Sequence, residues 1–144
     1  MGYNEIVPRL FQGSAVSAAE TYEHFDAIVL CAEEYQPRLP YFRGQVIRAP
    51  FGDSAHPTDK EINVARQAAN TVVSAYGRGA RVLVTCQAGL NRSGLVVGLA
   101  MRQLYPAASG PAVVAWIQRR RQEALCNPVF ARIVATAPSV GVAE

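Results

Sequence analysis

An apolar run, FDAIVLCA at residues 25–32 with Asp26 as its one polar residue, constrains the fold of this chain more than any other feature. A strand with one face in water alternates apolar and polar residues, whereas a strand buried on both faces is apolar throughout. The run therefore indicates a central strand of a sheet that is covered on both faces. Shorter runs predict further strands over 45–50 and 80–85, and a short edge strand over 9–13.

Helical patterns separate these strands. Thr58 and Glu61 form a capping box ahead of a segment that places small and apolar residues on one helix face. Ser17 and Glu20 form another capping box, which predicts a short helix over 18–25. The chain thus alternates between the two kinds of element from its first quarter onward.

The remaining helices are predicted in the C-terminal half. The segment 95–105 is nearly all apolar, which is typical of a helix buried on every side, and two more helices follow over 111–124 and 128–136. Strands that alternate with helices predict a single α/β domain with a mostly parallel central sheet flanked by helices. We expect this domain to span 1–137, and the small-residue-rich end at 138–144 to be a disordered tail.

The composition excludes several classes of protein. The chain has 144 residues, half of them hydrophobic, which is ordinary for one globular domain and too apolar for disorder. Its three cysteines, Cys31, Cys86 and Cys126, fit neither a disulfide framework nor a zinc site, so we expect a reducing, cytoplasmic compartment. We expect no membrane partner, because the sequence holds neither a signal-peptide pattern nor a membrane-length apolar run. A net charge of +3 permits an anionic partner without requiring one.

One segment, 80–105, joins a predicted strand, a glycine-containing loop and the buried helix. We call residues 86–92, CQAGLNR, the cysteine loop. Backbone amides in such a turn, together with the free N–H groups of the following helix, make a site for a tetrahedral oxyanion. The same positive field favours the thiolate form of Cys86, and the Arg92 guanidinium can bind two phosphate oxygens. The expected phosphate-binding residues are Gln87, Ala88, Gly89, Leu90, Asn91 and Arg92.

The segment TCQAGLNRSG at 85–94 resembles the signature HCxxGxxR[ST]G of protein tyrosine and dual-specificity phosphatases. Segments 5–14, 25–34 and 124–130 also resemble parts of this family, so the resemblance covers most of the chain. It implies a phosphomonoester hydrolase that forms a phosphocysteine intermediate and needs no metal or organic cofactor. The implied partners are proteins or peptides that carry phosphotyrosine, phosphoserine or phosphothreonine.

The same resemblance implies the catalytic residues. Cys86 is the expected nucleophile, Arg92 holds the phosphate, and Ser93 assists release of the thiolate in the second step. Asp53, which lies 33 residues before the cysteine (86 − 53), is the expected general acid. Asp59 and His56 are its rivals for that role.

Three features leave alternatives open. Thr85 stands where the signature has histidine, so a non-catalytic phospho-ligand-binding pseudophosphatase is one alternative. Asn91 beside the loop arginine resembles the RNA 5′-phosphatase branch, which makes an RNA 5′ end a minor second one. We interpret the arginine run at 119–121 as a solvated helix face, with recruitment of an anionic partner as the alternative. Cys31, in a buried strand, is expected to be inert.

Overall fold

The computed structural model describes residues 2–138, so the expected tail lies, apart from Pro138, outside the described residues. Its strands are β1 (Tyr3–Val7), β2 (Leu10–Ser14), β3 (Ala27–Ala32), β4 (Gln45–Phe51) and β5 (Val82–Cys86). Its helices are α1 (Ala15–Thr21), α2 (Asp59–Gly77), α3 (Arg92–Leu104), α4 (Gly110–Arg120) and α5 (Pro128–Thr136), with a 3₁₀ turn η1 (Tyr22–His24). Within the described chain no helix combines the length and the apolar character needed to cross a bilayer.

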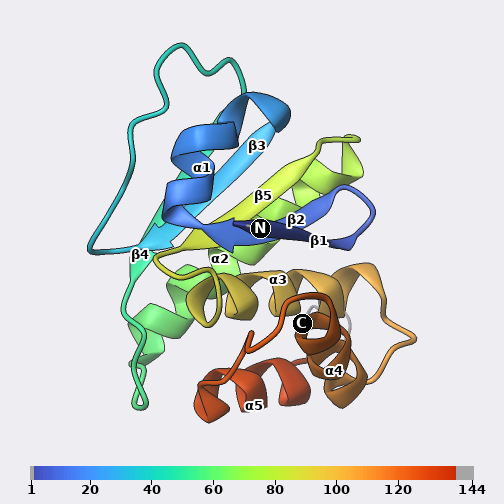
Figure 1. Ribbon diagram of the computed structural model, residues 1–144. Helices are drawn as coiled ribbons and strands as arrows, with labels where there is room; N and C mark the ends of the chain where they lie inside the picture. Colours follow the sequence, from blue (N-terminus) through green and yellow to red (C-terminus); the bar gives the residue numbers. More distant parts are fainter. Residues whose placement is uncertain (1, 139–144) are drawn as a thin grey trace.

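The strands form one sheet in the order β1-β2-β5-β3-β4 (Figure 1). The strands β2, β5, β3 and β4 are parallel to their neighbours, and β1 runs antiparallel to β2 at one edge. The sheet is therefore mixed but mostly parallel, as the alternation of strands and helices predicted. The additional strand β1 was not predicted as a separate strand, and Arg9, in the left-handed conformation at φ 70°, turns the chain into β2.

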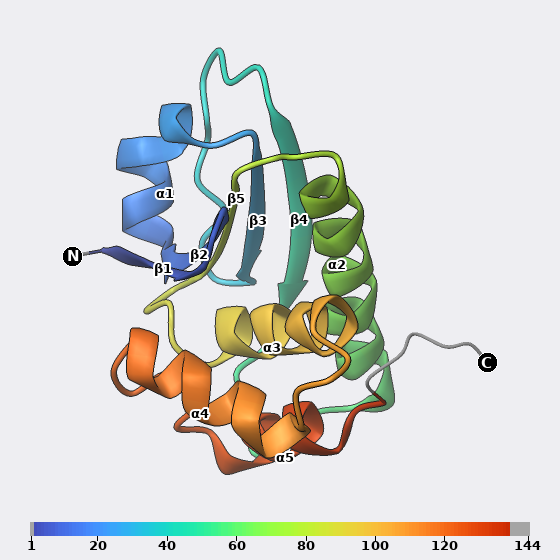
Figure 2. The ribbon, with the colours of Figure 1, turned by 90° about the vertical axis from the view of Figure 1, so that its right-hand side faces the viewer.

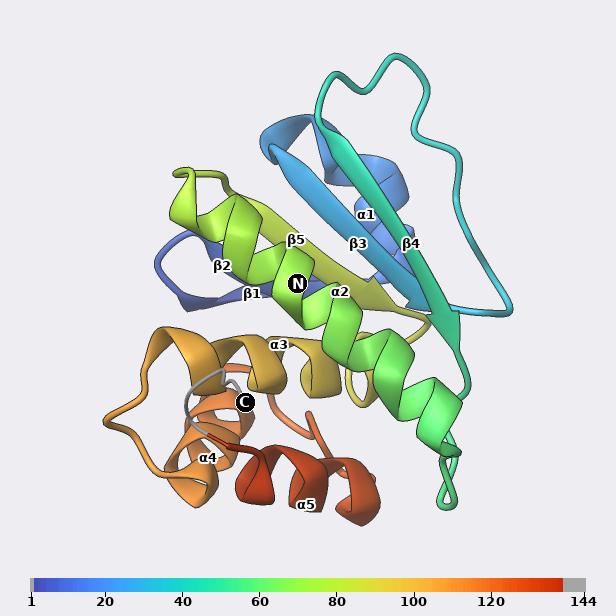
Figure 3. The same ribbon diagram turned by 180° about the vertical axis from the view of Figure 1, so that it is seen from behind.

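Helices cover both faces of the sheet. Figure 2 shows α1 on one face and α2 on the other, and α3 lies between the sheet and the pair α4 and α5. Seen from behind, α2 lies in front of the sheet and runs in nearly the same direction as β3 (Figure 3). This double covering is what the apolar run of β3 requires, and all six of its residues are buried.

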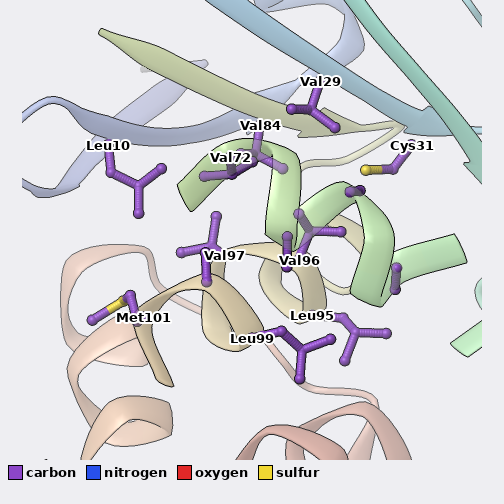
Figure 4. Close-up of a cluster of buried hydrophobic side chains, with 14 of the residues drawn as sticks. Leu10, Val29, Cys31, Val72, Val84, Leu95, Val96, Val97, Leu99 and Met101 are labelled. Atoms are coloured by element: carbon purple, nitrogen blue, oxygen red, sulfur yellow. The ribbon is translucent and has the colours of Figure 1, made fainter. Parts of the chain in front are cut away.

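The main core lies between the sheet and helices α2 and α3 (Figure 4). Val29 and Val84 project from the central strands toward Val72 of α2 and Val96 of α3, and all four side chains are fully buried. Every residue of α3 from its start through Arg102 is buried, which confirms the predicted buried helix. The helix begins at Arg92, three residues before the predicted start at 95, because it follows the cysteine loop without a linker.

Two predicted helix ends are wrong. Ser14, not Ser17, caps α1: its hydroxyl accepts from the Ser17 amide at 3.1 Å, while the Ser17 hydroxyl donates to the Ser14 carbonyl at 2.7 Å. The helix α4 ends at Arg120 rather than 124, because Arg121 is extended at φ −137° and ψ 105°; Glu123 and Leu125 beyond it are left-handed at φ 71° and 57°. The capping box of Thr58 and Glu61 at the start of α2 is confirmed.

Phe130 ties α5 to the end of β4. Its side chain is fully buried, and its ring lies 6.2 Å from that of Phe51. We expect Phe130→Ala to lower the free energy of unfolding by about 3–5 kcal/mol, because the substitution removes buried apolar surface and leaves a cavity. Urea denaturation measures this loss. Val16→Ala on the exposed face of α1 is the control, with an expected change within about 0.5 kcal/mol; equal losses in the two variants would contradict the packing assigned to α5.

Candidate active site

The carboxyl ends of the parallel strands bring three loops to one edge of the sheet. The register pairs Leu30 with Thr85 and Ala32 with Phe51, so β3, β4 and β5 end close together. The loop after β3 carries Glu34, the loop after β4 carries Asp53, and β5 runs into the cysteine loop. This edge is where ligands bind in open sheets of this kind.

The cysteine loop is fixed through its carbonyl oxygens. Those of residues 87–90 all accept hydrogen bonds from the surrounding scaffold, at 2.6–3.4 Å. The donors are the Ala15 amide for Gln87, the Arg121 guanidinium for Ala88 and Gly89, the Gln12 side-chain amide for Gly89 and Leu90, and the Leu125 amide for Leu90.

These bonds determine where the loop amides point. The described chain has no cis peptide bond, and in a trans peptide the N–H points away from the C=O of the same unit. Carbonyls held by the scaffold therefore turn the amides of residues 88–91 toward the opposite, inner side of the loop, which is the arrangement that binds an anion. Gly89 allows this path: its φ is 76°, and a Cβ there would lie 2.4 Å from the Gly13 carbonyl carbon.

Cys86 lies at the base of this loop. The side chain is 3% exposed, and its Sγ lies at hydrogen-bond distance, 3.3 Å, from Ser93 Oγ. A thiol can donate to the serine oxygen, whereas a thiolate can only accept from the serine hydroxyl. Ser93 is the second residue of α3, so the positive end of the helix dipole faces the same sulfur.

Arg92 is buried, and its guanidinium is paired with the Glu34 carboxylate. Its Nη1 and Nη2 each donate to one Glu34 carboxylate oxygen at 2.6 Å, and Nη1 also donates to the Phe51 carbonyl at 3.1 Å. The hydrogen bonding from the Arg92 guanidinium is the main cause that lowers the pKa of Glu34 from 4.5 to about 2. The same partner raises the pKa of Arg92, so the guanidinium stays charged.

Glu34 uses only one edge of the guanidinium. The planar group carries five N–H donors, and the bonds to Glu34 and Phe51 occupy three of them. Nε is buried and has no hydrogen-bond acceptor among residues 2–138. One edge of Arg92, made by Nε–H and an Nη2–H, therefore remains for a second bidentate partner, and a phosphate has the matching geometry.

Asp53 is held beside the loop by two amides. Asn91 Nδ2 donates to one carboxylate oxygen at 3.0 Å, and Asn127 Nδ2 donates to the other at 2.9 Å. Asn91 in turn accepts from the Asn127 backbone amide at 2.8 Å. The structure thus brings the expected acid to the cysteine loop through Asn91, and Asn127, the N-cap of α5, holds the other carboxylate oxygen.

Within the described chain the rivals of Asp53 make no hydrogen bond to the cysteine loop. Asp59 opens α2, where an acidic residue stabilises the helix N-terminus, and His56 is exposed. Thr85 is also occupied elsewhere: its buried hydroxyl donates to the Val29 carbonyl of β3 at 3.0 Å. Burial raises the pKa of the Cys31 thiol well above its usual value, which fits the expectation of an inert cysteine.

The structure corrects the interpretation of the arginine run. Arg119 and Arg120 lie near the Trp116 ring at the surface, but Arg121 is 9% exposed and lies against the loop carbonyls. Burial lowers its pKa, and the nearby Cys86 acts in the opposite direction. No carboxylate pairs with Arg121 in the described part of the chain, so an anion at the loop would be its counter-charge.

The sequence patterns did not identify Gln12, Glu34 and Arg121 as parts of the site. Two of them left a local signal. Gln12 is the one amide side chain in the apolar strand LFQGS, and Glu34 follows directly on the carboxyl end of a strand buried on both faces. Arg121 left none, since its neighbours in the run are exposed.

The Glu34–Arg92 pair predicts a pH dependence of stability. Because the pKa of Glu34 is about 2 in the folded protein and near 4.5 otherwise, the unfolded chain binds the proton first as the pH falls. The contribution of the pair to the free energy of unfolding should be complete above about pH 4.5 and decline as the pH falls toward 2. The measurement is the urea midpoint of wild type and Glu34→Gln at pH 6 and pH 3.

We expect the two midpoints to differ at pH 6 and to approach each other at pH 3. Glu20→Gln is the matched control, since Glu20 is exposed on α1 and has no ion-pair partner within the described chain. A wild-type advantage over Glu34→Gln that is independent of pH would mean that the carboxylate does not stabilise the fold through its charge.

Known proteins were compared with the chain by sequence and by structure. No family model matches the chain, and no curated protein matches its sequence. Solved structures do match. Human DUSP28 is 18% identical, with 95% of each chain covered and a TM-score of 0.76. Human tyrosine phosphatase-like serine/threonine/tyrosine-interacting protein is 20% identical, with 92% of each chain covered and a TM-score of 0.76.

Tk-PTP in its active form is 21% identical and has a TM-score of 0.71, with 94% of this chain and 97% of that chain covered. Identities this low leave the sequences barely comparable, whereas the coverage is nearly complete in both directions. The five-stranded sheet and its flanking helices thus follow one known architecture: the chain has the fold of the dual-specificity and tyrosine phosphatases.

Proposed function

We propose that residues 1–137 form a cysteine-dependent phosphatase that hydrolyses phosphotyrosine and phosphoserine or phosphothreonine in proteins or peptides. The observation that carries the proposal is the free edge of Arg92. Arg92 ends the loop that Cys86 begins, and the sulfur is near enough to help raise the pKa of the guanidinium, so an oxyanion held by the free edge would lie near the sulfur. The fold shared with phosphatases supports the same activity.

In the first step, the Cys86 thiolate attacks phosphorus. An S–P bond forms, the P–O bond to the substrate breaks, and the leaving oxygen takes a proton from the carboxylic acid of Asp53. Arg92 and the amides of residues 88–91 hold the phosphoryl oxygens throughout, so the charge that develops on them meets donors already in place. The product is a phosphocysteine.

In the second step, water attacks the phosphocysteine. The Asp53 carboxylate accepts a proton from the water, the new O–P bond forms, and the S–P bond breaks with its electron pair on sulfur. Ser93, 3.3 Å from the sulfur, donates a hydrogen bond to the departing thiolate and keeps its proton. Phosphate then leaves and the enzyme is ready for another substrate.

The pseudophosphatase alternative rests on Thr85. Its hydroxyl is bonded to β3 and so does not assist the sulfur as a side chain bearing a positive charge would. Against this alternative stands the retention of Cys86, Arg92, Ser93 and Asp53 in one site. An RNA 5′ end is the other alternative; no contact in the structure favours it, and a triphosphorylated oligonucleotide in the substrate panel tests it.

Substitution of the nucleophile distinguishes an active phosphatase from a pseudophosphatase. We expect Cys86→Ser to abolish hydrolysis of p-nitrophenyl phosphate while inorganic phosphate still binds, because Arg92 and the loop amides remain. Arg92→Ala should lose both properties. Steady-state assays measure hydrolysis, and isothermal titration calorimetry measures phosphate binding.

Cys126→Ser is the control for this experiment, since Cys126 is exposed and distinct from the proposed nucleophile. Full activity in Cys86→Ser would end the covalent mechanism. Phosphate binding by a wild-type protein without any turnover would favour the pseudophosphatase.

The role of Asp53 is tested with leaving groups of different basicity. We expect Asp53→Asn to slow hydrolysis of phosphoserine peptides by roughly two to four orders of magnitude, the usual range for a positioned proton donor. The loss should be smaller with p-nitrophenyl phosphate, whose leaving group needs little protonation. Asp59→Asn is the matched control, and a larger effect there than at Asp53 would transfer the role to α2.

A further inference from the structure

Gln12 is a polar side chain in a place where an apolar one would pack. It lies in β2, is fully buried and sits directly behind the cysteine loop. Its Nε2 lies 3.1 Å from Gly89 O, 3.3 Å from Leu90 O and 3.2 Å from Ser93 Oγ. Its Oε1 has no hydrogen-bond donor among residues 2–138. A buried amide with an unsatisfied oxygen destabilises the fold, so its three contacts need an explanation.

The two carbonyl oxygens fix the orientation of the Gln12 amide. A carbonyl oxygen can only accept, so Gly89 and Leu90 must face the NH₂ group and not Oε1. Ser93 Oγ lies against the same NH₂ group and therefore accepts as well. A serine hydroxyl carries a single proton, and with one lone pair engaged by Gln12 that proton is free for another acceptor.

The remaining acceptor beside Ser93 is the sulfur of Cys86, 3.3 Å away. We propose that Gln12 is a positioning residue, which holds Ser93 so that its hydroxyl proton points at the Cys86 thiolate. The proposal rests on the proposed function, in which that thiolate is the leaving group of the second step. Gln12 itself touches neither the phosphate nor the sulfur.

The proposal separates the two chemical steps. In the first step the thiolate loses charge as the S–P bond forms, so a donor aimed at sulfur helps little. In the second step the S–P bond breaks and the electron pair returns to sulfur, so the same donor stabilises the developing charge. Loss of Gln12 should therefore slow hydrolysis of the phosphocysteine more than its formation.

A double-mutant cycle measures this with p-nitrophenyl phosphate in stopped flow. The variants are Gln12→Met, which keeps length without a donor, Ser93→Ala, and both together. We expect Gln12→Met to slow phosphocysteine hydrolysis roughly threefold to tenfold, the loss of one ordinary hydrogen bond, and to produce a nitrophenol burst. In the Ser93→Ala background, Gln12→Met should change this rate by less than about twofold, because Gln12 acts through the Ser93 hydroxyl, which that background lacks.

The control is Thr85→Val, which removes another buried hydrogen bond of the neighbouring strand without touching Ser93. It should lower thermal stability while leaving the ratio of the two step rates unchanged. If Gln12→Met does not fold, Gln12→Leu replaces it, since leucine is apolar and close in size.

Two results would overturn the proposal. One is an equal fold loss from the Gln12 substitution with and without Ser93, which would mean that Gln12 acts through the loop carbonyls alone. The other is an equal slowing of both steps. Either is distinct from failure of the proposed function, which would appear as a wild-type protein without Cys86-dependent turnover.

Discussion

The outward anchoring of the loop carbonyls is the constraint on which the site depends. Four consecutive carbonyl oxygens, those of residues 87–90, are bound by groups from β2, α1 and the region after α4. Each bond fixes a peptide plane, and together they leave the loop amides no direction but inward. The scaffold thereby orients backbone amides into an anion-binding site, which does not depend on the side chains of residues 87–90.

Two arginines are buried at the site, and the charge of each must be balanced by its neighbours. Arg121 donates to carbonyl oxygens and to Asn4 Oδ1, all of them neutral acceptors. Arg92 is instead paired with a carboxylate whose other side reaches solvent, because the Glu34 side chain is 47% exposed. The neutral acceptors balance the charge of Arg121 only in part. The ion pair with Glu34 balances the charge of Arg92. The arrangement leaves the loop with a net attraction for an anion.

The sequence predicted features that leave a local pattern. Burial on both faces marks β3 as an apolar run, and the buried α3 is marked in the same way. The cysteine loop is contiguous, so its glycine, cysteine and arginine are read together. By contrast β1 is half exposed and carries Asn4 and Glu5, so no alternation distinguishes it from a loop. The end of α4 likewise left no pattern in the sequence that would have predicted it.

The rest of the site is made by contacts between residues far apart in the chain. Glu34 meets Arg92 across 58 positions, and Gln12 meets Gly89 across 77. Such pairs depend on which strands become neighbours, and the strand order β2-β5-β3 is a property of the whole sheet. Asp53 was predicted from the family resemblance, by its place 33 residues before Cys86. The two asparagines that hold its carboxylate are known only from the folded chain.

The strand order also explains how a site can work with threonine at position 85. Side chains on β5 alternate between the two faces of the sheet, and Thr85 uses its hydroxyl on the β3 side, at Val29 O. β2 lies on the other side of β5, with Gln12 in register with Val84, and from there Gln12 contacts Ser93. Polar support for the sulfur therefore comes from the neighbouring strand rather than from the residue before the cysteine. A neutral amide that orients a hydroxyl keeps this support independent of pH, which a titrating side chain at the same place could not do.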